Sequence, residues 1–520
     1  MNFDWTWKRL LFDFENGLFI KQTQELSFIN MLIHNWKEKI TKEINDNTFI
    51  PSAAFYCNVP KKGGLVRPGS HLEITDHFYY LHLIGEAYNN IFQTLKWSQE
   101  VKDFAYVLTG NIDGTKWVKN RFECWDAFRK RSIEKIGEGY PFVIIADITG
   151  YYENIDHFTL YSDLKIAGVE DKIANAIKTC HRKWAIIQNK GIPQACTASH
   201  ILAKLYLNEI DLALHDSKIE HLRYVDDIRI FCKSKAEAKK ALVQLIELLR
   251  LRGLNLQSAK TKILKAEDAR NSFENIQFII ENISSRIKEH QTLQNEAIID
   301  GLVLDNSPSL TPEQFEKLKE IKDAETIEVL IETFRAYFCE RSDESFDKTL
   351  FHYLLNRLAE ARNSFAVDYC LSIIEKHPQE TEYILKYITK INAQAKAIDE
   401  LTKFLSSPLS TYPFQEYQIL KWINENYQKV PEDIVAIIRE RHKEANDWYL
   451  KSEIKRHLGL FGNTADLSNI AADYPNCRTP MEQAETVLSL KRLEKVKRNS
   501  FYSKIKGDHP YVDAAIEITK

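Results

Sequence analysis

The sequence predicts an α+β domain followed by an all-α domain, and three observations support this. Short apolar runs, typical of buried strands, occupy residues 142–146 and both sides of Asp226-Asp227. Between and after these runs, apolar residues recur at helical spacing, so helices would back a small antiparallel sheet. From about residue 300 onward the strand signal fades and helical periodicity dominates. At 520 residues the chain has room for two or three domains.

The composition excludes several classes of protein. A hydrophobic content of 44% with 28% charged residues is typical of a folded protein without disordered character. The net charge is −3, so nucleic acid would need a local basic groove. No apolar run approaches a membrane span, and the N-terminus lacks the order of a signal peptide. The eight cysteines form no C-x-x-C pair, which argues against a zinc site or disulfide framework and predicts a cytoplasmic protein.

Residues 1–55 are expected to form an N-terminal helical extension. Leu26, Ile29 and Ile33 fall on one face of a helix, which favours a packing role.

A basic glycine turn follows at residues 59–68. Gly63 and Gly64 let the backbone approach a ligand closely, with lysines before them and Arg67 after. Such a loop can hold phosphates, with Arg67 offering a fork of donors and Lys62 a point charge. An ordinary basic hairpin has the same pattern, so the motif alone leaves both interpretations open.

The next informative segments are a strand and a helix start. The apolar run 142–146 ends in Asp147 and predicts a buried strand that delivers a carboxylate. The segment Gly191-Ile192-Pro193-Gln194 precedes a helix that Thr197 or Ser199 would cap. Gln194 would lie near the helix N-terminus, where backbone N–H groups favour a phosphate.

The pair Asp226-Asp227 lies between two short strand-like runs, which predicts the tip of a hairpin. This tip has no Gly or Asn to adopt a positive φ. Adjacent carboxylates repel each other unless a cation neutralises them, and Mg²⁺ is the natural choice. A solvated acidic turn is the commoner explanation of such a pair by itself.

Asp147 favours the magnesium site over the solvated turn, because neighbouring strands of one sheet would bring Asp147 close to Asp226. Two such carboxylates can hold two Mg²⁺ ions, one activating an attacking hydroxyl and one stabilising a leaving pyrophosphate. That is the chemistry of nucleotidyl transfer.

Five segments within residues 55–280 resemble motifs of the reverse transcriptases, and they follow one another along the chain in the order of those motifs. Tyr224-Val225-Asp226-Asp227 is the most diagnostic of them. The others are Asp147…Tyr152…Ile155-Asp156, Gly191-Ile192-Pro193-Gln194, Gly253-Leu254…Lys260-Thr261 and the loop Pro60-Lys61-Lys62-Gly63…Arg67-Pro68. The resemblance implies a right-hand polymerase fold, with fingers and palm in residues 56–290, acting as an RNA-directed DNA polymerase.

The resemblance also implies a role for each matching residue. Asp147 and Asp226 would be metal ligands together with the carbonyl of Ile148, and Asp227 would support them. The metal would be two Mg²⁺ ions, for which Mn²⁺ is a possible substitute. The other matching residues would contact the nucleotide. Arg67 and Lys62 would hold the triphosphate, and Gln194 would line the pocket. Tyr152 would lie under the sugar and select deoxynucleotides, and Lys260 would protonate the pyrophosphate.

Two qualifications accompany these roles. Lys260 is equally well explained as an ordinary surface lysine. The family usually has Gly after Pro-Gln, whereas this chain has Ala195, whose methyl group could narrow the space for template or nucleotide.

Residues 291–520 are expected to form an α-helical repeat domain. Similar helical pieces place Leu385, Leu420 and Leu450 at spacings of 35 and 30 residues, which suit HEAT or TPR hairpins. A polymerase followed by such helices resembles the bacterial abortive-infection and defence-associated reverse transcriptases. This implies antiphage defence, homo-oligomers, dNTP substrates and a single-stranded DNA product, with no membrane association. Some members prime from a protein tyrosine, and some copy or need a non-coding RNA.

The sequence does not choose a priming residue. Tyr56 beside the basic loop, and Tyr502 and Tyr511 in the basic C-terminal segment, are candidates. Two other functions stay open: a retroelement enzyme of retron or intron type that copies a structured RNA, and an inactive palm-fold scaffold that binds RNA.

Overall fold

The computed structural model describes residues 2–20, 23–112, 114, 116–273, 283, 327–340 and 346–520. The chain divides into two compact units. The first contains Met1–Cys57 and Pro68–Phe273, and the second contains Asn58–Arg67 and Glu274–Lys520. The expected N-terminal extension therefore belongs to the first unit rather than forming a unit of its own. The expected domain border near residue 290 lies outside the described residues.

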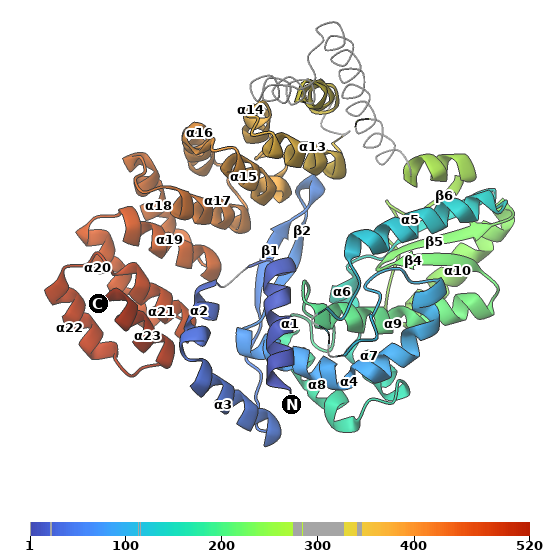
Figure 1. Cartoon of the computed structure of the whole chain (residues 1–520), viewed down its shortest axis with the longest axis horizontal. Coiled ribbons are helices and arrows are strands. Elements are labelled where there is room, and N and C mark those ends of the chain that lie inside the picture. The colour runs from blue at the N-terminus through green and yellow to red at the C-terminus, as the bar shows by residue number, and fades with distance from the viewer. Residues whose placement is uncertain are drawn as a thin grey trace, which may run out of the picture. The chain divides into compact units, whose positions relative to one another are not determined.

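The first unit contains a four-stranded antiparallel sheet, whose strands lie beside α5 (Arg121–Gly137) and α10 (Lys235–Leu251) in Figure 1. Its strand order is β4 (Glu220–Tyr224), β5 (Asp227–Cys232), β3 (Phe142–Asp147) and β6 (Lys262–Lys265). The register pairs Phe142 with Cys232 at one end and Asp147 with Asp227 at the other. Chain segments far apart in sequence therefore meet at one edge of this sheet.

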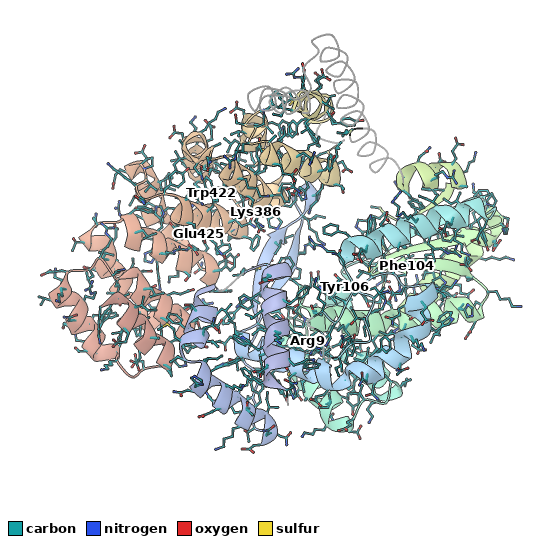
Figure 2. The ribbon with its side chains drawn as sticks, in the orientation of Figure 1. Arg9, Phe104, Tyr106, Lys386, Trp422 and Glu425 are labelled. Atoms are coloured by element: carbon teal, nitrogen blue, oxygen red, sulfur yellow. The ribbon has the colours of Figure 1, made fainter. Side chains whose placement is uncertain are left out.

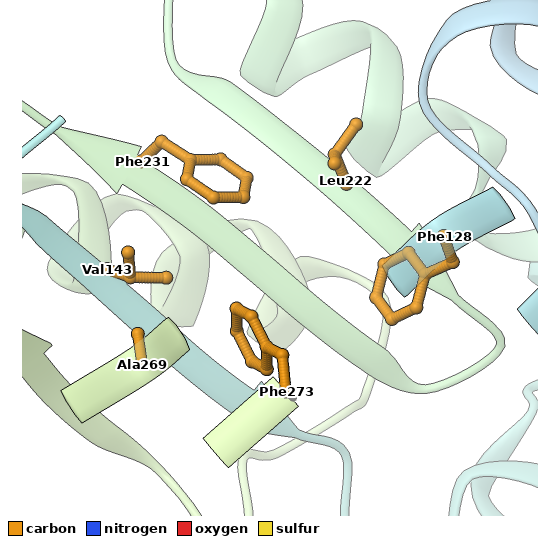
Figure 3. Packing of buried hydrophobic residues seen from close by; sticks show 6 residues of the cluster. All are labelled: Phe128, Val143, Leu222, Phe231, Ala269 and Phe273. Carbon is orange, nitrogen blue, oxygen red and sulfur yellow. The ribbon is translucent and has the colours of Figure 1, made fainter. Parts of the chain in front are cut away.

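One face of the sheet is buried against helices. Since side chains alternate along a strand, Val143 of β3, Leu222 of β4 and Phe231 of β5 point to the same side. They pack with Phe128 of α5 (Arg121–Gly137) and with Ala269 and Phe273 of the helical residues 266–273 (Figure 3). Packing of this core stabilises the register in which Asp147, at the end of β3, lies opposite Asp227, at the start of β5.

Besides α5, the helices α9 and α10 contact the sheet, α9 at β4 and α10 at β3 and β5. The long helix α4 packs against α1, α8 and α9. The bounds of these and the remaining helices of the first unit are α1 Phe3–Asn16, α2 Thr23–Met31, α3 Ile33–Asn45, α4 Ile74–Val101, α6 Tyr151–Asn154, α7 His157–Ile166, α8 Asp171–Trp184, α9 Thr197–Asp216 and α10 Lys235–Leu251.

The second unit is mostly helical, and alternate helices pack on one another: α13 on α15, α15 on α17, α17 on α19, α19 on α21 and α21 on α23. Residues 327–334 are helical and continue into a π-helical turn at Arg335–Cys339. The later helices are α13 Lys348–Glu360, α14 Val367–Ser372, α15 Thr381–Lys390, α16 Gln394–Ser406, α17 Pro413–Asn426, α18 Glu432–Glu444, α19 Trp448–Phe461, α20 Thr464–Ala472, α21 Pro480–Ser489, α22 Lys495–Ile505 and α23 Pro510–Thr519.

The tip of a two-stranded hairpin also belongs to the second unit. The hairpin consists of β1 (Phe55–Pro60) and β2 (Val66–His71), and its tip contains the basic glycine turn. Tyr412 donates a hydrogen bond from its hydroxyl to the carbonyl of Gly64 at 3.1 Å. Lys62 Nζ donates to the carbonyl of Phe346 at 3.5 Å.

Among the helices that the structure describes, none combines the length and apolar character that crossing a bilayer requires.

Candidate active site

Three carboxylates lie close together at one end of the two central strands, β3 and β5. This end of the sheet is called the carboxylate edge below. Asp147 is the last residue of β3 and Asp227 is the first of β5, and the antiparallel register places them opposite each other. Asp226 lies in the turn between β4 and β5, directly before Asp227. Although 79 residues separate Asp147 from Asp226, the pairing of β3 with β5 brings them to the same place.

The electrostatics of this edge oppose three simultaneous negative charges. Burial, together with the charges of Asp147 and Asp227, raises the pKa of Asp226 to about 6. Burial also raises the pKa of Asp227, partly offset by Arg229. A cation bound at this edge would relieve the repulsion and restore the ionised forms.

A buried arginine lies beneath these carboxylates. Arg229, two residues after Asp227 on the same face of β5, has its guanidinium 4.0 Å from the ring of Phe128 and 3.6 Å from that of Phe273. Burial lowers the pKa of Arg229 to about 10, and Asp227 opposes that shift. The sequence gives no sign of this role for Arg229, since the strand pattern predicts an apolar residue at a core position.

Lys260 also reaches the carboxylate edge. Its Nζ lies 3.0 Å from Asp147 Oδ2, and 65% of its side chain is exposed. A backbone bond from Gln257 N–H to the carbonyl of Asp147, at 2.7 Å, ties the segment that precedes Lys260 to β3. Lys260 is therefore both next to the carboxylates and accessible from solvent.

The residues present fit a magnesium ion. In the part of the chain that the structure describes, no three His, Cys, Asp or Glu side chains form a metal cage. Mg²⁺ needs only one or two protein carboxylates, since water and phosphate oxygens complete its shell. On either side of Ile148, the carbonyl of Asp147 accepts from Gln257 N–H and the N–H of Thr149 donates to the carbonyl of Asn255.

The turn between β4 and β5 is strained. Val225 has a φ of +57°, in the left-handed region that β-branched residues avoid. The sequence lacks a glycine here, so valine itself adopts the conformation, at a cost of about 1–3 kcal/mol. The strain lies immediately before Asp226, and this suggests that the direction of that carboxylate depends on it.

Tyr152 belongs to an aromatic cluster that the sequence did not reveal. Its hydroxyl lies 2.7 Å from Nδ1 of His200, and the ring of His200 stacks on Tyr106 at 4.0 Å between centroids. Burial lowers the pKa of His200 to about 4 and raises that of Tyr152, so both groups are neutral and share one hydrogen bond. Figure 2 labels Tyr106 beside Phe104, two residues earlier in the chain.

Gln194 lies in a loop that the N-terminal helix supports. The N–H of Gln194 donates to the hydroxyl of Ser70 at 3.2 Å. Ala195 has a φ of +67°, the conformation that glycine adopts most easily, and the backbone of Gly17 lies against its carbonyl. A Cβ at Gly17 would come within 2.8 Å of that oxygen, so the two backbones fit only because residue 17 is glycine.

The start of α9 is capped differently from the expectation. Neither Thr197 nor Ser199 caps it; Asp13 of α1 accepts the backbone N–H of Thr197 at 3.0 Å and the hydroxyl of the same residue. His77 also contacts Asp13, at 2.9 Å. A cap supplied from 184 residues earlier has no local signal in the sequence.

The other predicted residues are distributed between the two units. Asp147, Ile148, Asp226, Asp227 and Lys260 lie together at the sheet edge, and Tyr152 and Gln194 belong to the same unit. Lys62 and Arg67 belong to the second unit.

Two of the candidate priming tyrosines have engaged hydroxyl groups. The hydroxyl of Tyr56 donates to the carbonyl of Trp184, and burial raises the pKa of Tyr56 to about 12. Tyr502 is only 4% exposed, and its hydroxyl donates to the carbonyl of Val487 at 3.4 Å. A priming hydroxyl must reach a nucleotide, so neither is suited to the role in this conformation.

Residues 60–293 match a family model described as reverse transcriptase (RNA-dependent DNA polymerase). The matched segment contains all three carboxylates, Tyr152, Gln194 and Lys260, so these residues lie in a segment similar to a reverse transcriptase domain. A search among proteins of curated function found no match.

Several solved structures of telomerase are similar to the chain. One, apo telomerase from Candida tropicalis truncated from its C-terminal domain, shares 13% identity with a TM-score of 0.30, over 41% of this chain and 50% of that one. Telomerase from Candida tropicalis with the TWJ fragment of telomeric RNA shares 14% identity with a TM-score of 0.32, over 74% and 67%. The corresponding complex from Candida albicans shares 10%, with a TM-score of 0.31, over 77% and 63%. The chain thus spans half the length of the first of these proteins.

Proposed function

We propose that the protein is a DNA polymerase that adds deoxynucleotides to a growing single-stranded DNA through the reverse transcriptase domain matched by residues 60–293. The observation that carries this proposal is the convergence of Asp147 and Asp226 at one edge of the sheet. The charge of Asp147 there raises the pKa of Asp226, which a divalent cation would reverse.

The carboxylates of Asp147 and Asp226 and the carbonyl of Ile148 would hold two Mg²⁺ ions, with Asp227 in support and Mn²⁺ as a substitute. When bound, such ions activate the attacking hydroxyl and stabilise the leaving pyrophosphate. Lys260, with its ammonium beside Asp147, would donate a proton to the departing pyrophosphate.

The other assigned residues would bind the nucleotide. Arg67 and Lys62 would hold the triphosphate, and Gln194 would line the pocket at the start of α9, where backbone N–H groups favour a phosphate. Tyr152, held by His200, would contact the sugar and reject a 2′-hydroxyl.

The second unit supports an assignment to antiphage defence through its repeated helices. Side-chain hydrogen bonds recur between residues 33 apart: Trp422 with Thr389, His457 with Asn424, and Tyr427 with Gln394. Figure 2 labels Trp422 on its helix. Equal spacing of equivalent contacts is the property of a stacked helical repeat, and a polymerase joined to such repeats resembles the defence-associated reverse transcriptases. We include homo-oligomer formation and a companion non-coding RNA in this proposal.

The decisive experiment offers Mg²⁺ and labelled dNTPs to the purified protein, with and without added RNA. We expect labelled DNA to form without added template. If a tyrosine is the primer, this DNA should be bound to the protein and should be released from it by proteolysis. Asp226→Asn should lower incorporation at least about a hundredfold, since a metal ligand supplies several kcal/mol.

Other outcomes point to the alternative functions. Synthesis that requires a structured RNA would indicate a retroelement enzyme. Absence of synthesis under all conditions, with retained RNA binding, would indicate a scaffold. In cells challenged with phage, wild-type protein should reduce plaque formation and Asp226→Asn should not.

A further inference from the structure

A network of buried charges lies behind the turn that carries Asp226. Arg223 of β4 has a side chain that is 2% exposed, and its Nη2 lies 2.6 Å from Asp103 Oδ2 and 2.6 Å from Asp211 Oδ2. Its Nε donates to Asp211 Oδ1 at 3.0 Å, so Asp211 is held by two donors in the planar fork. Lys204 contacts the other carboxylate, with Nζ 2.7 Å from Asp103 Oδ2.

The remaining guanidinium nitrogen reaches the turn itself. Arg223 Nη1 donates to the carbonyl of Val225 at 3.0 Å. Val225 is the residue with the left-handed backbone, and its carbonyl belongs to the peptide that leads into Asp226. A fixed carbonyl fixes the plane of that peptide, and with it the direction in which the Asp226 side chain leaves the backbone.

We propose that Arg223, held by Asp103 and Asp211, is the positioning residue that keeps the strained Val225 turn in the geometry in which Asp226 binds a divalent cation. This inference rests on the proposed function and adds residues to which no role has been assigned.

The charge balance of the network explains why a buried arginine can perform this role. Two cations, Arg223 and Lys204, face two anions, Asp103 and Asp211, so these four groups together carry no net charge. Burial disfavours the ionised form of Asp211, but Arg223 and His221 outweigh it and lower the pKa of Asp211. Burial likewise opposes the charge of Arg223, but the two aspartates raise its pKa.

The backbone attaches the same network to the sheet. Arg223 N–H donates to the carbonyl of Lys102 at 2.8 Å, and Phe104 N–H donates to the carbonyl of Arg223 at 2.9 Å. The segment that contains Asp103 thus runs beside β4. Lys204 also donates to the carbonyl of Ala105 at 2.8 Å. The partners of Arg223 are therefore rigid, as a residue that positions another one requires.

The test measures Mn²⁺ binding directly, from the electron paramagnetic resonance signal of the free ion, in the full-length protein. Arg223→Lys replaces the fork with a point charge that cannot reach three acceptors at once, and Asp211→Asn weakens the hold on the fork without touching the turn. We expect each to raise the Mn²⁺ dissociation constant by about 10- to 100-fold, as for other groups that orient metal ligands. The kcat of dNTP incorporation should fall by a similar factor, with the dNTP KM changed less than threefold, about 0.7 kcal/mol.

Arg9→Lys is the matched control. Arg9 is 3% exposed and lies over the rings of Trp5 and Trp117, in the same unit but on α1 rather than on β4; Figure 2 labels it. This variant should lose thermal stability but keep the Mn²⁺ dissociation constant of the wild type. All measurements are made at a temperature below that at which the least stable variant unfolds. If Arg223→Lys does not fold, the test rests on Asp211→Asn alone.

The proposal is overturned if Asp211→Asn is folded and its Mn²⁺ affinity and kcat both stay within twofold of wild type, because the network is then only structural. A wild-type protein that neither binds Mn²⁺ nor incorporates dNTPs would instead contradict the proposed function. The two failures are thus told apart by the wild-type measurement.

Discussion

At the residue scale, the candidate site combines groups whose partners were visible in the sequence with groups whose partners were not. Asp147 and Asp226 were selected because each ends a strand-like run and because both fall in recognisable motifs. His200, Tyr106 and Arg223 carry no such pattern, and only their contacts in the fold connect them to Tyr152 and to the Val225 turn.

His200→Ala should reduce the preference for deoxynucleotides about fivefold. The variant removes the hydrogen-bond partner of the Tyr152 hydroxyl, and one such bond contributes about 1 kcal/mol to holding the ring. The measurement is the ratio of kcat/KM for dNTP to that for rNTP. His215→Ala, on the same helix but packed against Trp97, is the control and should leave the ratio unchanged.

Asp76 should make the stability of the first unit depend on pH. Burial, with help from Glu73, raises the pKa of Asp76 from 3.8 to about 7, so the folded state keeps a proton that the unfolded state has released. Its contribution to stability is therefore fully present below about pH 4 and is lost as the pH rises to about 7.

Asp76→Asn removes this dependence while keeping an oxygen for the N–H of Ser52. We subtract the free energy of unfolding of wild type from that of the variant. This difference should be about 2–4 kcal/mol larger at about pH 8 than at about pH 4, because only wild type loses stability over this range. Urea titrations at the two pH values measure it. A difference that does not change with pH would contradict the assigned protonation of Asp76.

At the scale of elements, the start of α9 depends on α1. Asp13 accepts the first N–H of α9, and Gly17, just past the end of α1, lies against the Ala195 carbonyl in the loop that also contains Gln194. The N-terminal helix is thus part of the support of the candidate nucleotide pocket, although the sequence predicted only a packing helix.

Asp13→Ala should cost about 3 kcal/mol in the unfolding of the first unit, because it leaves Thr197 and His77 without their buried partner. Amide hydrogen exchange at residues 194–198 should also become faster. Asp4→Ala, on the same helix, removes an exposed ion pair with Lys37 and should change stability by less than about 0.5 kcal/mol. Equal effects of the two substitutions would show that Asp13 has no special role.

At the scale of the whole molecule, the two compact units should respond to substitutions separately. Each has its own buried core, and α19 and α21 of the second unit approach closely at Gly459. A Cβ on this glycine would lie 2.4 Å from the backbone carbonyl of Ser489, so the two helices would have to separate.

Gly459→Ala should therefore destabilise the second unit by about 1–3 kcal/mol through overpacking. Calorimetry, or hydrogen exchange resolved along the chain, should show the loss in residues 346–520 and not in residues 68–273. Gly137→Ala, at a helical position with open space around it, should be neutral or slightly stabilising. Loss of protection in both units from Gly459→Ala would show that they unfold as one.

The sequence by itself determined the strands that end in Asp147 and begin at Asp227, the turn between β4 and β5, and the helical character of residues 346–520, since these follow from the spacing of nearby residues. Only the tertiary structure decided what holds them: the cap from Asp13, the stack of His200 with Tyr106, and the contact of Arg223 with Asp103. Each joins residues about a hundred positions apart or more. Packing selects such partners, because a side chain's burial and geometry depend on every element around it and not on the residues next to it in sequence.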